Sequence, residues 1–314
     1  MKKKMINEVH IEGWVYDHKL EVKVTGESSK NPGTTYINGV LNVATDDACM
    51  NVVPVYYTYV TATTSTGKSN NAFVVLKSII DGAPTVISAG RDNATKVRID
   101  SSVALNEWYQ DEKTLVSNKR VEGGFIHLVT NEPLSEDEAQ RNRFKCDMLI
   151  TGVFENEGDP ERNLPAKTIV KGYVFNFRNQ LLPVEFSAID PNAQKYFQRQ
   201  ECSPNRPFCT WVRGKVISQT VVIKETEESA FGGSEVRERK TSVRDYVITG
   251  ANPEPYAWDD EAFITAKEMG EALATREVDL AAMKKRNEDY KQSKAAPKNE
   301  PSAFGNIANG PYGF

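Results

Sequence analysis

The chain has 314 residues, of which 39% are hydrophobic and 26% are charged, and its formal net charge is −4. This length accommodates two domains with separate cores, and the charge shows no overall basic excess, although nucleic-acid binding needs only one basic face. No apolar run approaches the ~20 residues of a membrane helix, and no apolar segment follows the basic start at Lys2 as it would in a secretory signal. We therefore expect a cytoplasmic protein with no membrane partner.

The predicted elements begin with a long strand. Residues 6–25 alternate in character and are rich in β-branched and aromatic side chains, which is typical of a strand. The elements expected after it are strands at 36–43 and 51–57, a helix at 71–80 that ends at Gly82, and strands at 95–104 and 124–130. The first half therefore consists of three strands, a helix and two strands.

The second half repeats this order of elements. Its expected elements are strands at 147–155, 167–178 and 180–189, a helix at 190–197, and strands at 209–224 and 243–249. Asp190 as N-cap and Pro191 at the first helical position predict the start of the helix. The charged segment 225–240 predicts a mobile loop, and the composition of 259–292 predicts a C-terminal helix.

Short sequence matches support a repeat of one domain. The matched pairs are Gly13 with Gly152, Gly39 with Gly172, and Pro54 with Pro183. Five strands with a helix between the third and fourth is the order of the OB-fold, which often binds oligonucleotides across its second and third strands. We therefore expect a mostly β protein with two tandem OB-fold-like five-stranded barrels, a C-terminal helix and a flexible tail. The expected divisions are 1–135 and 136–250 for the barrels, 251–292 for a linker and the helix, and 293–314 for a disordered tail.

Alternation along the strands predicts which side chains face outward. The residues predicted to face the barrel interiors are Ile37, Leu41, Val97, Ile99, Val170, Val174, Val212 and Val216. The residues predicted to face outward and to form a binding surface are Trp14, Tyr16, Tyr36, Lys96, Arg98, Lys171, Tyr173, Phe175, Phe177, Trp211, Arg213 and Lys215. Aromatic rings that stack on bases, interleaved with cations that contact phosphates, suit a single-stranded nucleic acid.

A second interpretation of the same surface stays open. Outward aromatic residues on a barrel also pack against a neighbouring domain, the C-terminal helix or another subunit, so a structural or assembly protein and a homo-oligomer are alternatives. Register also matters, because a shift of one residue would exchange the inward and outward faces.

Residues with catalytic or metal-binding chemistry are scattered. The four cysteines are Cys49, Cys146, Cys202 and Cys209, and neither they nor the three histidines have metal-ligand spacing. Thr66-Gly-Lys-Ser69 matches the end of a phosphate-binding loop, but the motif requires a glycine where this chain has Ala62. No motif places a nucleophile beside His10 and Glu12, and no acidic metal cluster emerges. We expect structural thiols, no metal, no cofactor and no enzymatic activity.

Two stretches carry a resemblance to a known family. Ile11-Glu-Gly-Trp-Val-Tyr16 and Gly39-Val-Leu-Asn-Val-Ala-Thr45 resemble the opening strands of bacterial and phage single-stranded DNA-binding proteins. Residues 1–250 also resemble uncharacterised tandem-OB proteins of phages and mobile elements. The resemblance implies a partner, single-stranded DNA, that is bound and protected during replication or recombination. It also implies stacking roles for Trp14, Tyr36, Tyr173 and Trp211.

The C-terminal tail departs from the pattern of this family. Family members recruit replication and recombination proteins through an acidic tip with a terminal aromatic residue. In this chain Phe314 is terminal, but the preceding residues 309–313 contain no acid. The resemblance therefore implies such partners, and the tail lacks the acidic residues that would recruit them.

Overall fold

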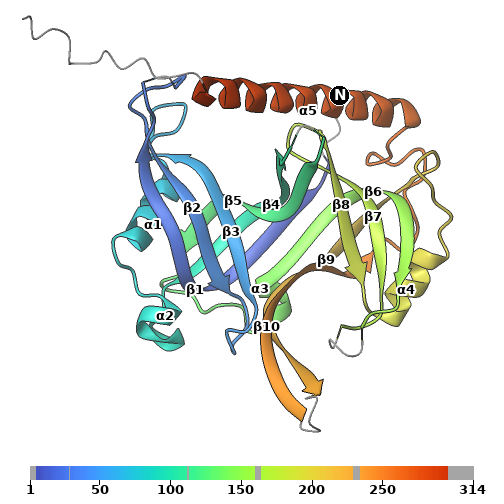
Figure 1. The fold of residues 1–314 in the computed structure, drawn as a ribbon, viewed down its shortest axis with the longest axis horizontal. Helices are drawn as coiled ribbons and strands as arrows, with labels where there is room; N and C mark the ends of the chain where they lie inside the picture. Colours follow the sequence, from blue (N-terminus) through green and yellow to red (C-terminus); the bar gives the residue numbers. More distant parts are fainter. Residues whose placement is uncertain (1–4, 28, 112, 160–163, 229–233, 296–314) are drawn as a thin grey trace, which may run out of the picture.

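A computed structural model describes residues 5–27, 29–111, 113–159, 164–228 and 234–295. Over 221–228, 234–241 and 290–295 it describes the backbone only. The chain is mostly β, and the strands join in a 10-stranded sheet (Figure 1). A 30-residue helix, α5 (Ala266–Ala295), lies across the top of the molecule in this view.

Five strands of the first half are paired in a ring. They are β1 (Asn7–Val24), β2 (Thr35–Ala44), β3 (Val52–Thr61), β4 (Lys96–Tyr109) and β5 (Leu115–Leu128). The pairings β1–β2, β2–β3, β4–β5 and β1–β4 are antiparallel, and β3–β5 is parallel. Three helices lie between β3 and β4 in the sequence, namely α1 (Asn71–Ile80), α2 (Val86–Ala89) and the 3-10 helix η1 (Arg91–Asn93).

Five strands of the second half are paired in the same way. They are β6 (Asn142–Asn156), β7 (Lys167–Phe175), β8 (Leu181–Ala188), β9 (Phe208–Glu228) and β10 (Ser234–Ala251). The pairings β6–β7, β7–β8, β9–β10 and β6–β9 are antiparallel, and β8–β10 is parallel. Helix α4 (Pro191–Gln198) lies between β8 and β9, and the short α3 (Glu138–Arg141) precedes β6.

The helix starts follow from the capping residues. The Asn70 side chain accepts a hydrogen bond from the backbone N–H of Ala72 at the start of α1. The Asp190 side chain accepts from Asn192 and Ala193 at the start of α4, as the sequence predicts. The inward positions are confirmed as well, because every residue predicted to face an interior is buried.

Two predictions about the strands are wrong. Residues 225–228 and 234–240 of the predicted loop instead continue the β9–β10 pairing, with Glu228 opposite Ser234, and residues 229–233 lie outside the described residues. The match of Gly13 with Gly152 does not hold in the structure. Gly13 lies opposite Val97 on the fourth strand of its half, β4, whereas Gly152 lies opposite Lys171 on the second strand of its half, β7.

One pair of matched glycines does have the same structural role. A Cβ atom at Gly39 would lie 2.0 Å from the carbonyl oxygen of Lys19, and one at Gly172 would lie 2.2 Å from that of Leu149. In both halves the second strand therefore crosses the first at a distance that only glycine permits.

The two halves meet along a seam between β1 and β6. These strands pair over residues 7–11 and 142–146, with Asn7 opposite Cys146 and Ile11 opposite Asn142. One hydrophobic cluster continues across the seam and includes Val9 and Phe144. The seam therefore places side chains of both halves on one continuous sheet face.

Helix α5 covers apolar residues at one end of the second half. Leu149, Phe175, Leu181 and Cys209 form a buried cluster against which Met269 and Leu273 pack. Arg276 of α5 forms an ion pair with Glu107 of β4 and donates a hydrogen bond to the carbonyl oxygen of Leu181 at 3.2 Å. The helix thus contacts strands of both halves. No helix within the described residues is long and apolar enough to cross a membrane.

Candidate functional site

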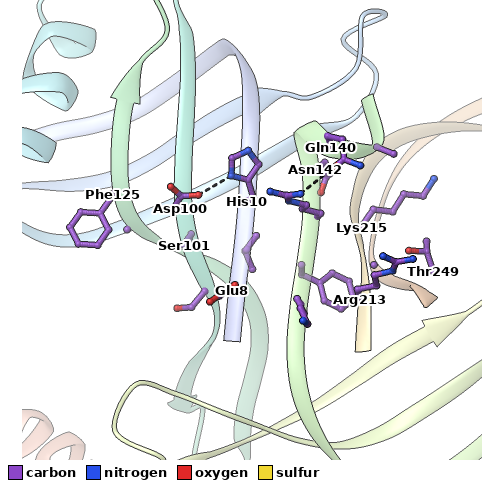
Figure 2. Close-up of a pocket in the computed structure, with 18 of the residues that line it drawn as sticks. Glu8, His10, Asp100, Ser101, Phe125, Gln140, Asn142, Arg213, Lys215 and Thr249 are labelled. Carbon is purple, nitrogen blue, oxygen red and sulfur yellow. Dashed lines mark hydrogen bonds and ion pairs between the residues drawn. The ribbon is translucent and has the colours of Figure 1, made fainter. Parts of the chain in front are cut away.

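A cleft of about 910 Å³ lies at the seam between the two halves (Figure 2). One side is formed by residues of β1, β4 and β5, and the other by α3, β6, β9 and β10. The charged and aromatic residues that line the cleft include Glu8, His10, Asp100, Phe125, Arg143, Lys145, Arg213 and Lys215.

Strand register places these side chains in rows across the sheet. Phe125 lies opposite Asp100, Asp100 opposite His10, and His10 opposite Arg143. In the next row Glu8 lies opposite Lys145, and Lys145 opposite Arg213. Because directly opposed residues project from the same face of a sheet, four strands contribute to the first row. The cleft is therefore built by the regular pairing of β5, β4, β1, β6 and β9.

The side of the cleft formed by β6 and β9 is basic. Arg143, Lys145, Arg213 and Lys215 are all exposed, and none of them forms an ion pair within the described part of the chain. We call these four residues the basic wall. Cations without acidic partners in a concave site create a positive potential that attracts anions.

Local contacts orient three side chains of the basic wall. Arg143 donates a hydrogen bond from Nη1 to Oε1 of Gln140 at 2.8 Å. Lys145 places its Nζ 5.2 Å from the centroid of the Trp211 ring. Arg213 lies against Gly250, where a Cβ atom would be 2.7 Å from the arginine Nε. The wall therefore has an aromatic ring, Trp211, directly beside its cations.

The opposite side carries two carboxylates and an aromatic ring. Asp100 accepts a hydrogen bond from Nδ1 of His10 at 2.8 Å, as Figure 2 shows. Glu8 is exposed, and Phe125 keeps 75% of its side-chain surface accessible. We call Glu8, Asp100 and Phe125 the acidic wall. The cleft therefore differs in charge from one wall to the other.

Glu12 lies on the same face of β1 as Glu8 and His10, opposite Arg98 of β4. Burial raises the pKa of its carboxyl group, but hydrogen bonds from the Ser135 backbone N–H and Arg98, together with the positive charge of Arg98, outweigh burial and lower the pKa below its usual value. The distances are 2.7 Å from Ser135 N to Oε1 and 3.3 Å from Arg98 Nε to Oε2. The carboxylate of Glu12 is thus a structural anion that positions His10 and Arg98.

Only part of the predicted surface reaches the cleft. Arg213 and Lys215 line it, and Trp211 lies beside it. Lys171 and Phe177 are exposed but lie outside the lining, and the half-buried residues outside it are Tyr16, Tyr36, Lys96, Arg98 and Tyr173. Several of these make other contacts, since Lys171 pairs with Glu185 and Tyr36 packs on Tyr59.

The prediction that Trp14 belongs to an accessible binding surface is wrong. Trp14 retains only 7% of its surface, and it packs with Ala94 and Leu134 in a small cluster. The guanidinium groups of Arg91 and Arg141 lie 5.6 and 5.3 Å from its ring centroid. The segments before β4 and after β5 pack over this face of β1. Alternation along a strand does not indicate whether another segment packs on its outward face.

The same prediction is wrong for Phe175. Only 3% of its surface is accessible, because it belongs to the apolar cluster that α5 covers. Tyr173 also packs against this cluster, which explains why it is half-buried. Packing of outward aromatic residues against the C-terminal helix is the alternative that the sequence left open, and Phe175 follows it.

Sequence reasoning missed half of the basic wall. The predicted strand at 147–155 began too late, since β6 starts at Asn142. Within that missed portion, exposed Arg143 and Lys145 alternate with buried Phe144 and Cys146. This alternation is a readable strand signal. Asp100 and Phe125 fell inside predicted strands, but nothing in the sequence indicated that they would be opposed.

The described residues contain no cluster of metal ligands. No group of three or more histidine, cysteine, aspartate or glutamate residues there could hold a metal ion. Burial raises the pKa of the Cys49 and Cys202 thiols, which keeps both thiols protonated at neutral pH.

Comparison with known proteins assigns a family. The model of the YorF family matches residues 5–291. The chain belongs to the YorF family. Among solved structures, this YorF family member is similar to a deletion mutant of the single-stranded DNA binding protein from Thermus aquaticus, with 10% sequence identity and a TM-score of 0.44. The match covers 82% of this chain and 100% of that chain. No curated protein matches the chain.

Proposed function

We propose that this protein binds single-stranded DNA in the cleft at the β1–β6 seam and that it acts by binding, without catalysing a reaction. The observation that carries the proposal is the basic wall, in which Arg143, Lys145, Arg213 and Lys215 have no acidic partner in the described chain. Phosphates along a single strand would supply the missing anions and release their counterions. Coating of this kind would protect single strands during replication or recombination.

The pairing of the strands supports an OB interpretation of both halves. Each half has a ring of pairings in the order first, second, third, fifth and fourth strand, with a helix before the fourth. We propose that the two rings are tandem OB barrels, the first within 1–135 and the second within 136–250. The proposed binding face is formed by first and fourth strands of both rings, together with β5.

Two aromatic residues are proposed to stack on bases. Trp211 lies beside Lys145 of the basic wall, and Phe125 is exposed across the cleft. Each stacked base contributes about 1–3 kcal/mol in single-strand binding proteins. Lys96 and Arg98 continue the same face of β4 beyond Asp100, and a longer strand would reach the more distant Tyr16, Tyr36, Lys171, Tyr173 and Phe177.

The experiment is a titration of a labelled thymidine oligonucleotide by fluorescence anisotropy at several salt concentrations. The variant Arg213→Gln with Lys215→Gln removes two proposed phosphate contacts. We expect its plot of log K against log salt to be shallower by about 0.7 per lost contact. The matched control, Lys30→Gln with Lys267→Gln, removes two exposed lysines outside the cleft and should keep the wild-type slope.

The outcome separates single-strand binding from an assembly function. An aromatic pair of half-buried Tyr36 and exposed Tyr59, with ring centroids 4.7 Å apart, lies outside the cleft and would suit a subunit contact. An assembly protein would show no oligonucleotide binding at low salt and would sediment as a defined oligomer. That result would overturn the proposed function.

A further inference from the structure

The two walls of the cleft impose different chemistry on a bound strand. Phosphates are attracted by the basic wall and repelled by the carboxylates of Glu8 and Asp100 on the acidic wall. A strand in the cleft would therefore turn its backbone toward β6 and β9, and its bases toward β1, β4 and β5. The charge difference between the walls thus determines that the bases of the nucleic acid contact the acidic wall and the phosphates contact the basic wall.

Phe125 and Asp100 would meet the same base. They lie directly opposite each other on β5 and β4, so their side chains project side by side from one face. Phe125 keeps 75% of its surface accessible, and the Asp100 side chain keeps 60%. A base stacked on the ring of Phe125 would present the hydrogen-bonding groups on its edge to the carboxylate of Asp100.

A carboxylate discriminates among the four bases because it only accepts hydrogen bonds. Guanine offers two adjacent donors, N1–H and the N2 amino group, which match the two oxygens of a carboxylate. Cytosine and adenine each offer one amino donor beside a ring nitrogen that accepts. Thymine offers N3–H between two carbonyl oxygens, both of which a carboxylate repels.

The surroundings of Asp100 favour its role as an acceptor. His10 donates from Nδ1 to Oδ1 of Asp100 at 2.8 Å, which orients the carboxylate group. Arg143, the residue opposite His10 on β6, donates from its Nη1 to Gln140 at 2.8 Å and forms no ion pair with Asp100 within the described residues. Glu8 supplies a second exposed carboxylate one row further along the cleft.

We infer that the acidic wall reads base edges, and that the cleft prefers single strands containing guanine over strands of thymidine alone, with Asp100 as the principal acceptor. This inference rests on the proposed function, since it assumes that a single strand occupies the cleft. A bidentate contact of this kind is worth roughly 5- to 150-fold in discrimination between bases.

The test compares three oligonucleotides of equal length by anisotropy, using the full chain. One contains thymidine only, one alternates thymidine with guanosine, and one alternates thymidine with inosine, which lacks the N2 amino group. We expect the guanosine strand to bind about 5- to 150-fold more tightly than the thymidine strand, with the inosine strand between them. Circular dichroism of the free guanosine strand checks that it stays unfolded.

Variants of the acidic wall complete the test. Asp100→Asn should remove the preference for guanosine over inosine while thymidine binding persists, and Glu8→Gln should reduce the preference less. Equal binding of all three strands by the wild type, or a preference that survives in Asp100→Asn, would overturn the inference and leave the proposed function standing. Failure to bind any strand would count against the proposed function itself.

Discussion

Asn51 and Asn142 both donate a side-chain hydrogen bond to the carbonyl oxygen of Val216, at 3.0 and 2.7 Å. Asn51 precedes β3 in the first half, whereas Asn142 begins β6 and Val216 lies on β9 in the second. Both amides are buried, and each also accepts a backbone N–H of β9, Asn142 from Val216 and Asn51 from Ser218. Val216, the neighbour of Lys215 in the basic wall, is thus held by amides of both halves.

This junction leads to a prediction about stability. Removal of a buried amide leaves the Ser218 N–H without its partner, and a lost partner of this kind costs about 1–3 kcal/mol. Asn51→Ala should therefore lower the free energy of unfolding by that amount in urea denaturation. The control is Asn38→Ala, whose bond to the Thr58 carbonyl is exposed and whose effect should stay within about 0.5 kcal/mol. Equal effects of the two variants would contradict the assignment.

The shape of the basic wall depends on a glycine between two of its cations. A Cβ atom at Gly214 would lie 2.0 Å from the Val247 carbonyl oxygen and 2.7 Å from the Phe144 ring. Gly214→Ala should therefore destabilise the protein by about 1–3 kcal/mol through overpacking. Gly26→Ala is the matched control, because nothing lies within 4 Å of its added Cβ atom. Thermal denaturation of both variants provides the comparison.

Trp211 tests the stacking contribution. Trp211→Ala removes the ring that lies under Lys145, and we expect oligonucleotide affinity to fall by about 1–3 kcal/mol. Trp258→Ala removes an indole that is 83% exposed and outside the cleft lining, so affinity should be unchanged. An anisotropy titration measures both. A loss of affinity in the Trp258 variant alone would place binding elsewhere.

Glu12 predicts a dependence of stability on pH. Its pKa in the folded protein is lowered from 4.5, so the folded state binds fewer protons than the unfolded state near that pH. The stabilising contribution of Glu12 is therefore fully present above pH 4.5 and is lost as the pH falls through the lowered folded pKa. Glu12→Gln should be less stable than wild type at neutral pH, and the difference in the free energy of unfolding should shrink as the pH falls below 4.5. Urea denaturation across this range checks the sign.

Local signals in the sequence were sufficient for the order of the strands and for the residues that face their interiors. Alternation correctly placed Ile37 and Val174 inside, and capping chemistry at Asp190 fixed the start of α4. These signals lie within a few residues of the element that they describe. Trp14 and Phe175 were misplaced because their covers come from distant segments, the former from the loops beside β1 and the latter from α5.

The cleft itself was beyond local signals. It exists because β1 pairs with β6, and this pairing brings Asp100 and Arg143 to opposite sides of His10. The alternation within one strand does not specify which strand of the other half pairs with that strand. Alternation along the strand predicted that Arg213 and Lys215 face outward. Their position in one cleft with Phe125 and Asp100 follows only from the pairing of the strands.

The most direct test of the central claim is to locate the bound strand by photochemical cross-linking. An oligonucleotide carrying 5-bromodeoxyuridine would be irradiated in complex with the full chain, and the attached peptides identified by mass spectrometry. We predict cross-links at Phe125 or Trp211, on the two sides of the seam. Cross-links confined to other aromatic residues, such as Tyr59 or Phe177, would contradict binding in the cleft.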